Sequence, residues 1–93
     1  MPRKPPGKPV NLRLPQGGQR TVELNADDFL TLRKAGADAP PEVKAIEKQF
    51  ARLRGMGLLT HQFRQRGDFP IAVAVLTPDG RQALTQDPNA YAA

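Results

Sequence analysis

The sequence predicts a small α+β domain with an N-terminal β-hairpin, two main helices, a second hairpin and a short C-terminal helix. Residues 10–14 and 20–24 alternate apolar and polar side chains around a Gly-Gly loop, which is the pattern of two paired strands. Residues 41–56 instead place their apolar side chains at helical spacing. Alternation returns over residues 59–76, where a glycine-containing tip separates two strand-like runs.

The length of 93 residues favours a single domain, which we expect to span residues 10–84. Residues 1–9 hold four prolines and three cations, and such a segment buries too little apolar surface to offset the entropy of ordering it. We therefore expect a flexible basic arm that either follows phosphates or only solvates the chain. Its cations are Arg3, Lys4 and Lys8. Residues 85–93 carry no clear signal, and we expect a poorly ordered tail there.

The composition gives little support to an enzyme. The chain has no cysteine and no serine, which excludes a disulfide, a thiolate metal site and a serine nucleophile. Its single histidine, His61, is too few for a histidine-based zinc site. We expect no catalysis, cofactor, metal or small-molecule substrate. The lack of cysteine suits a reducing compartment and the apolar runs are too short for a membrane helix, so we expect a cytoplasmic protein.

Residues 25–35 carry the signals of a capped helix. Asn25 is placed to cap its first turn, where Asp27 and Asp28 meet the positive end of the helix dipole. Gly36 can supply a left-handed stop. The apolar residues expected to pack this helix are Leu24 and Phe29, as a hydrophobic staple, together with Leu30 and Leu32.

Residues 41–56 predict a second helix that begins with Pro41 at its first position. One stripe is apolar and consists of Val43, Ile46, Phe50 and Leu53. The opposite face is cationic with an amide beside it, and consists of Lys44, Lys48, Gln49 and Arg52. Cations suit phosphates and guanine, and an amide suits adenine, so these are the residue types of a DNA recognition helix. The same pattern is typical of an ordinary amphipathic helix with a solvated face.

The segment after this helix predicts a hairpin and a last helical turn. Gly55 and Gly57 end the helix, and the hairpin tip at residues 64–68 reads RQRGD. Thr77 is placed to cap the last helix, with Pro78 at its first position. In so small a domain we expect the five aromatic residues to supply much of the core. They are Phe29, Phe50, Phe63, Phe69 and Tyr91.

Positive charge is clustered along the chain. Residues 1–22 carry five cations and no acid, and residues 43–66 carry six cations against Glu47 alone. Such clusters favour a polyanionic partner, although a basic surface that only aids solubility gives the same count.

Residues 43–84 resemble the winged helix-turn-helix of the multiple-antibiotic-resistance (MarR-like) transcriptional regulators. A helix containing Leu53 ends at Gly57-Leu58, a basic hairpin follows, and "LTPDGR" at residues 76–81 starts the next helix. The resemblance implies duplex DNA binding, with helix 41–56 in the major groove and the wing tip at 64–68 on the backbone or minor groove. The implied contacts are Lys44, Lys48, Gln49, Arg52, Arg64 and Arg66.

The chain departs from that family in two ways. The family has three helices before the wing, whereas only two are predicted here, so helix 25–35 would form the first half of the helix-turn-helix. The long terminal helices that dimerise family members are absent, which leaves the 10–24 hairpin edge as a candidate surface for a homodimer. We therefore expect a small transcriptional regulator or an accessory factor of DNA metabolism. The alternative is a winged-helix protein-interaction module in a larger assembly, including a phage or plasmid complex.

Overall fold

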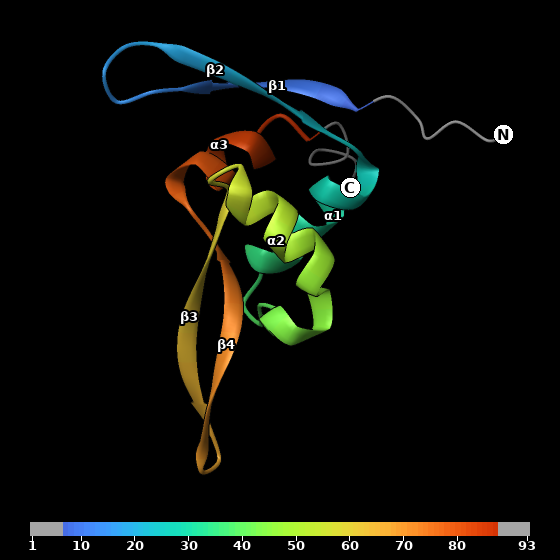
Figure 1. Ribbon diagram of the computed structural model, residues 1–93, viewed down its shortest axis with the longest axis vertical. Coiled ribbons are helices and arrows are strands. Elements are labelled where there is room, and N and C mark those ends of the chain that lie inside the picture. The colour runs from blue at the N-terminus through green and yellow to red at the C-terminus, as the bar shows by residue number, and fades with distance from the viewer. Residues whose placement is uncertain (1–6, 88–93) are drawn as a thin grey trace, which may run out of the picture.

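The computed structural model describes residues 7–87 and has an α+β architecture with two separate antiparallel hairpins. Its elements are β1 (Lys8–Arg13), β2 (Gln19–Leu24), α1 (Ala26–Ala35), the 3-10 helix η1 (Val43–Ile46), α2 (Glu47–Gly55), β3 (Leu59–Arg66), β4 (Phe69–Leu76) and α3 (Pro78–Leu84). The β1–β2 hairpin crosses one end of the molecule above α1 and α3, while the β3–β4 hairpin projects from the other end (Figure 1).

The N-terminal hairpin forms as predicted and starts earlier, at Lys8, so part of the expected arm belongs to β1. Two glutamine side chains, one in α3 and one just after it, close the outer edge of β1. Asn11 N–H donates to Gln86 Oε1 at 3.3 Å and its carbonyl accepts from Gln86 Nε2 at 2.7 Å. Arg13 exchanges the same pair of bonds with Gln82, at 2.9 and 3.3 Å. Each amide group therefore takes the place of a residue in a neighbouring strand.

Helix α1 begins as predicted. The Asn25 side chain accepts from Asp28 N–H at 2.9 Å, and the Asp28 carboxylate accepts from Asn25 N–H at 3.0 Å, which forms a capping box. The expected left-handed stop at Gly36 is wrong, because Gly36 keeps a helical φ of −85°. The expected packing role of Leu30 is also wrong, since it is exposed while Phe29 and Leu32 are buried.

Residues 41–56 do not form one helix. Ala74 N–H donates to Pro41 O at 2.9 Å and Glu42 bridges to Val73, so this segment is extended beside β4. Helical structure then starts as η1 and is interrupted at Ile46, where φ is −131° and ψ is 35°, before α2 begins at Glu47. Pairing with β4 therefore overrides the local preference for helix in the first turn.

The chain leaves α2 through a Schellman turn. Gly57 has φ 77°, which glycine adopts at little cost, Leu58 N–H donates to Leu53 O at 2.9 Å, and Gly57 N–H donates to Arg54 O at 2.9 Å. The predicted ends at Gly55 and Gly57 are confirmed. Thr77 caps α3 as predicted, and its hydroxyl accepts from Gly80 N–H at 3.0 Å.

The two ends of the β3–β4 hairpin are fastened to each other. Thr77 N–H donates to Leu58 O at 3.1 Å, and the Thr77 hydroxyl donates to Gly57 O at 2.6 Å. Gly80 packs so tightly here that a Cβ atom on it would lie 2.1 Å from Leu58 O. The base of the hairpin is thus a compact junction between the end of α2 and the start of α3.

The core joins both hairpins to the three α-helices. The predicted apolar stripe is partly confirmed, because Phe50 and Leu53 are buried, whereas Val43 and Ile46 are half-buried at its margin. The expectation that all aromatics serve the core is wrong for Phe63 and Phe69, which are exposed on the projecting hairpin. Tyr91 lies outside the described residues. The central buried residues are Val10, Leu12, Leu24, Phe29, Leu32, Phe50, Leu53, Leu58 and Leu59.

One arginine of β2 links the hairpin to the rest of the molecule. Arg20 Nη2 donates to Met56 O at the end of α2, and it forms an ion pair with Asp79 Oδ2 at 3.0 Å in the first turn of α3. A third of the Arg20 side chain remains exposed. Arg20 therefore connects three elements that are far apart in sequence.

Candidate nucleic-acid interface

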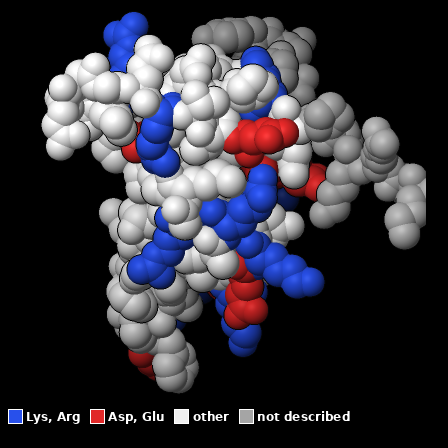
Figure 2. Space-filling view, turned by 45° about the horizontal axis from the view of Figure 1, so that its top comes forward, with Lys and Arg blue, Asp and Glu red and all other residues white. Residues whose placement is uncertain are grey.

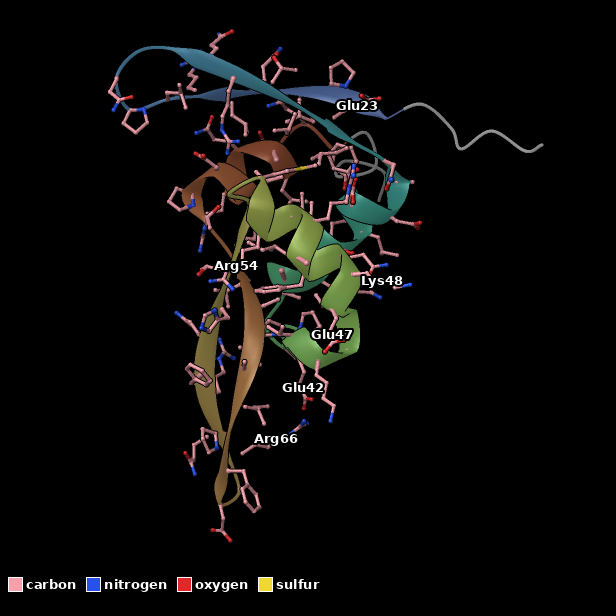
Figure 3. The ribbon with its side chains drawn as sticks, in the orientation of Figure 1. Glu23, Glu42, Glu47, Lys48, Arg54 and Arg66 are labelled. Carbon is pink, nitrogen blue, oxygen red and sulfur yellow. The ribbon has the colours of Figure 1, made fainter. Side chains whose placement is uncertain are left out.

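Helix α2 and η1 present three of the predicted contact residues to solvent. Lys44, Lys48 and Gln49 are exposed, and none of their side chains has an ion pair or hydrogen bond among residues 7–87. Lys48 points to one side of α2 and Arg54 to the other, with Glu47 near its start (Figure 3). The side-chain donors of Lys48 and Arg54 are therefore available to ligands on opposite sides of the helix.

Arg52 is paired with an acid of another helix, which its sequence position does not predict. Its Nη2 lies 3.2 Å from Asp28 Oδ2 and its Nε lies 3.3 Å from Asp28 Oδ1. The same Nη2 lies 3.3 Å from the carbonyl oxygen of Glu23. These contacts join α2 to the start of α1 and the end of β2, and Asp28 is only 2% exposed. Arg52 thus positions α2 and keeps only part of its guanidinium free.

The two arginines of the β3–β4 hairpin differ in whether they form an ion pair within the protein. Arg66 Nη1 forms an ion pair with Glu42 Oε1 at 2.7 Å, although 73% of its side chain is exposed. Arg64 is exposed and has no ion pair among the described residues. The free cation of the hairpin is therefore Arg64, whereas Arg66 also fastens the hairpin to the segment before η1.

Two further arginines were not selected from the sequence. The Arg54 guanidinium lies 5.9 Å from the centroid of the Phe50 ring, and Arg54 lies on the side of α2 that faces the β3–β4 hairpin (Figure 3). Arg81 of α3 lines a cleft of about 270 Å³ together with Arg64 and Gln62. The spacing of Arg54 one turn after Phe50 was the available signal for the first. The second required knowledge of how α3 packs against the hairpin.

The predicted residues line several separate depressions of the surface. Lys48, Gln49 and Arg52 line a shallow depression of about 170 Å³ that also contains Asp27 and Asp28. Lys44 lines a groove of about 430 Å³ between η1 and β4, and Arg64 and Arg66 line a third of about 220 Å³. Carboxylates thus lie between the cations, as the space-filling view shows (Figure 2). Such a surface favours a ligand with phosphates at separated points.

The predicted arm residues are only partly described. Lys8 lies in β1 and its Nζ donates to the carbonyl oxygen of Gln86 at 2.9 Å. Arg3 and Lys4 lie outside the described residues. Residues 85–87 pack onto the body of the protein instead of belonging to a loose tail, because Asp87 is buried and pairs with Arg33 at 3.2 Å.

Within residues 7–87, no group of three or more His, Asp or Glu side chains is placed to hold a metal ion. None of the helices described there has the length and apolar character needed to cross a membrane. Comparison with known proteins finds no matching family model, no matching curated protein and no matching solved structure.

Proposed function

We propose that this protein binds duplex DNA as a small winged-helix protein, acting as a transcriptional regulator or an accessory factor of DNA metabolism. In this proposal α2 enters the major groove and the β3–β4 hairpin is the wing on the backbone or minor groove. One observation carries the proposal. Helix α2, which exposes Lys48 and Gln49, passes through the turn at Gly57 directly into a projecting hairpin that carries the unpaired Arg64.

The order of the elements supports this proposal. Three helical segments, α1, η1 and α2, precede the β3–β4 hairpin, as three helices precede the wing in the family that the sequence resembles. η1 has only four residues and leads into α2 without a separate turn. The helix-turn-helix of this proposal therefore consists of α1 and α2, and η1 lies in the connection between them.

The ion pairs refine the roles of the proposed contact residues. Lys44, Lys48, Gln49 and Arg64 have free donors and are the proposed DNA contacts, with Arg54 added on the hairpin side of α2. Arg52 and Arg66 are already paired with Asp28 and Glu42, so in this proposal they mainly fix the orientation of α2 and of the hairpin.

The test is an NMR titration of the full chain with a generic duplex at low salt. We expect shifts at residues 44–54 and 62–68, and an affinity that falls as salt rises. Replacing Lys48 or Arg64 with alanine should reduce the slope of log affinity against log salt by up to about 0.9 for each phosphate that the variant no longer neutralises.

The matched control is Arg13→Ala, which removes an exposed cation from β1, away from α2 and the β3–β4 hairpin. We expect this variant to keep the wild-type salt slope. Equal losses for Arg13→Ala and Lys48→Ala would indicate diffuse attraction to any cation, and the absence of binding to duplex at low salt would contradict the proposal.

A protein-interaction module is the second candidate, favoured by the groove between η1 and β4. Val43, Ile71 and Ala72 give that groove apolar walls, while Glu42, Lys44 and Glu47 edge it. A duplex titration without shifts, combined with binding of a defined partner that shifts Val43 and Ile71, would favour this function over DNA binding.

A further inference from the structure

Two aromatic rings stand out on the β3–β4 hairpin. Phe63 is 69% exposed and Phe69 is 73% exposed, and Leu30 is the one other large apolar side chain that is exposed among residues 7–87. Both residues belong to the β3–β4 hairpin, which projects from the end of the molecule opposite the N-terminal hairpin (Figure 1). Two large exposed aromatic rings on one projecting element make this hairpin a candidate binding surface.

The strand register places the two rings on opposite faces of the hairpin. Phe63 lies directly across from Ala72, and Phe69 lies directly across from Arg66. Directly opposed residues share a face and successive residues alternate, so Phe63 and Arg66, three residues apart on β3, lie on different faces. Phe69, which shares the face of Arg66, is therefore on the other side from Phe63.

The surroundings leave both rings accessible. Among the described residues, the one ring packed on Phe63 is that of His61, edge-on at a centroid distance of 5.3 Å, and the residue across from Phe63 is the small Ala72. Phe69 adjoins the two-residue turn Gly67–Asp68 at the tip. A flat and rigid partner, such as a protein face, can cover one face of a hairpin and would leave the other ring in water.

A partner that contacts both rings must therefore surround the hairpin on two sides. Nucleobases do this where two strands separate, because each strand offers the flat face of an unpaired base, and aromatic side chains stack on any base. A hairpin with side chains on both faces is about 10 Å thick, far more than one base step of about 3.4 Å. It fits a fork or a gap and does not fit between the bases of a continuous stack.

We infer that the β3–β4 hairpin is a wedge that binds where nucleic-acid strands part, with Phe63 stacked on an unpaired base on one face and Phe69 on an unpaired base on the other. The inference rests on the proposed function and specifies its preferred substrate as a duplex with an unpaired junction. Arg64, on the same strand as Phe63 and without an ion pair among the described residues, supplies positive charge for an adjoining phosphate.

The test compares three oligonucleotide substrates of one sequence: a continuous duplex, a duplex that ends in a fork, and a single strand. We expect the fork to bind most tightly. Phe63→Ala and Phe69→Ala should each weaken fork binding by about 5- to 150-fold, the range for removing one base stack, while affecting the continuous duplex by less than about twofold. Leu30→Ala, an exposed apolar change on α1, is the control and should leave fork binding unchanged.

The chain contains no tryptophan, so Phe63→Trp places a single fluorescent reporter at the wedge. Stacking on a base should quench its emission with the fork and not with the continuous duplex. A blue shift on anionic phosphatidylglycerol vesicles, without quenching by the fork, would assign the rings to a membrane and overturn the inference. Because both phenylalanines are exposed, all these variants should retain the wild-type circular dichroism spectrum.

The result also separates this inference from the proposed function. Equal binding of fork and continuous duplex, unchanged in Phe63→Ala and Phe69→Ala but weakened in Lys48→Ala, would overturn the wedge and leave duplex binding intact. Failure of every substrate to bind would overturn both.

Discussion

At the residue scale, Asp28 shows how one side chain can serve two structures at once. Its carboxylate accepts from Asn25 N–H in the cap of α1 and also pairs with Arg52 of α2. The carboxylate is almost wholly buried, whereas about half of the Arg52 side chain is exposed. Water therefore screens the arginine but cannot replace the partners of the acid.

Asp28→Ala should lower the free energy of unfolding by about 2–3 kcal/mol, because it removes both a helix cap and a charged hydrogen-bonding partner. Urea unfolding followed by circular dichroism measures the loss. Asp27→Ala is the control, since Asp27 is exposed in the same helical turn, and it should cost less than about 1 kcal/mol. A double-mutant cycle with Arg52→Ala should give a coupling of about 1 kcal/mol or more, and additive losses would contradict the linkage.

Gly80 and Gly55 should respond in opposite directions to the same change. Gly80→Ala places a methyl group 2.1 Å from the backbone oxygen of Leu58 and should destabilise the protein by about 3 kcal/mol. Gly55→Ala meets no atom within 4 Å in the last turn of α2 and should stabilise it by about 0.4–1 kcal/mol. Thermal unfolding of both variants checks this, and similar shifts in melting temperature would contradict it.

Residue identities that act locally could be predicted from the sequence, and those that act across the fold could not. Asn25 and Thr77 cap the helices that follow them, because a cap depends on bonds within three residues. The pairing of Arg52 with Asp28 spans 24 positions, and no spacing rule covers it. For the same reason Arg52 looked like a free contact residue.

At the scale of elements, long-range pairing decided where predictions failed. The helix expected over residues 41–56 lacks its first turn, because Glu42 bridges to β4 instead. The residues that follow form the 3-10 helix η1 before α2 begins. The β3–β4 hairpin and its tip could be predicted because alternating apolar side chains and a turn glycine are local signals. The alternation of side chains, however, continues beyond the part of the hairpin that packs on the core. Phe63 therefore follows the apolar pattern and is still exposed.

The glutamines beside β1 give a prediction about the N-terminal hairpin. Gln82→Ala combined with Gln86→Ala removes the partners of Asn11 and Arg13, so the edge of β1 should open to water. We expect hydrogen exchange at these two amides to accelerate by at least about tenfold, as about 1.4 kcal/mol of protection corresponds to that factor. Gln19→Ala on β2 is the control, and unchanged exchange at Asn11 and Arg13 in the double variant would show that the caps do not protect the strand.

At the scale of the whole molecule, the number of cations in a segment differs from the number that the fold leaves unpaired. The sequence places a strong excess of cations in residues 43–66, yet two of these cations, Arg52 and Arg66, are paired in the fold. The clustering could be read from the sequence, whereas the division between paired and free cations depends on acids from other elements. Only the free ones belong to the proposed interface.

Arg20 gives a prediction at this scale because it joins β2 to α2 and α3. Arg20→Ala should lower the free energy of unfolding by about 1–3 kcal/mol, with the partly exposed ion pair to Asp79 contributing the smaller share. NMR intensities of β1–β2 and of α2, followed through a urea titration, should lose their common midpoint. A common midpoint in this variant would show that the apolar contacts alone keep the hairpin coupled to the helices.

The closed base of the β3–β4 hairpin has a mechanical consequence. Eight residues separate each end of the hairpin from its tip, so the arm is about 27 Å long at the usual rise per residue. A tilt of about 5° at the base would move the tip by about 2 Å over such a length. The hydrogen bonds from Thr77 to Gly57 and Leu58, with Gly80 packed against them, lie at the base about which the hairpin would tilt. These few contacts at the base therefore limit how far the tip of the β3–β4 hairpin can move.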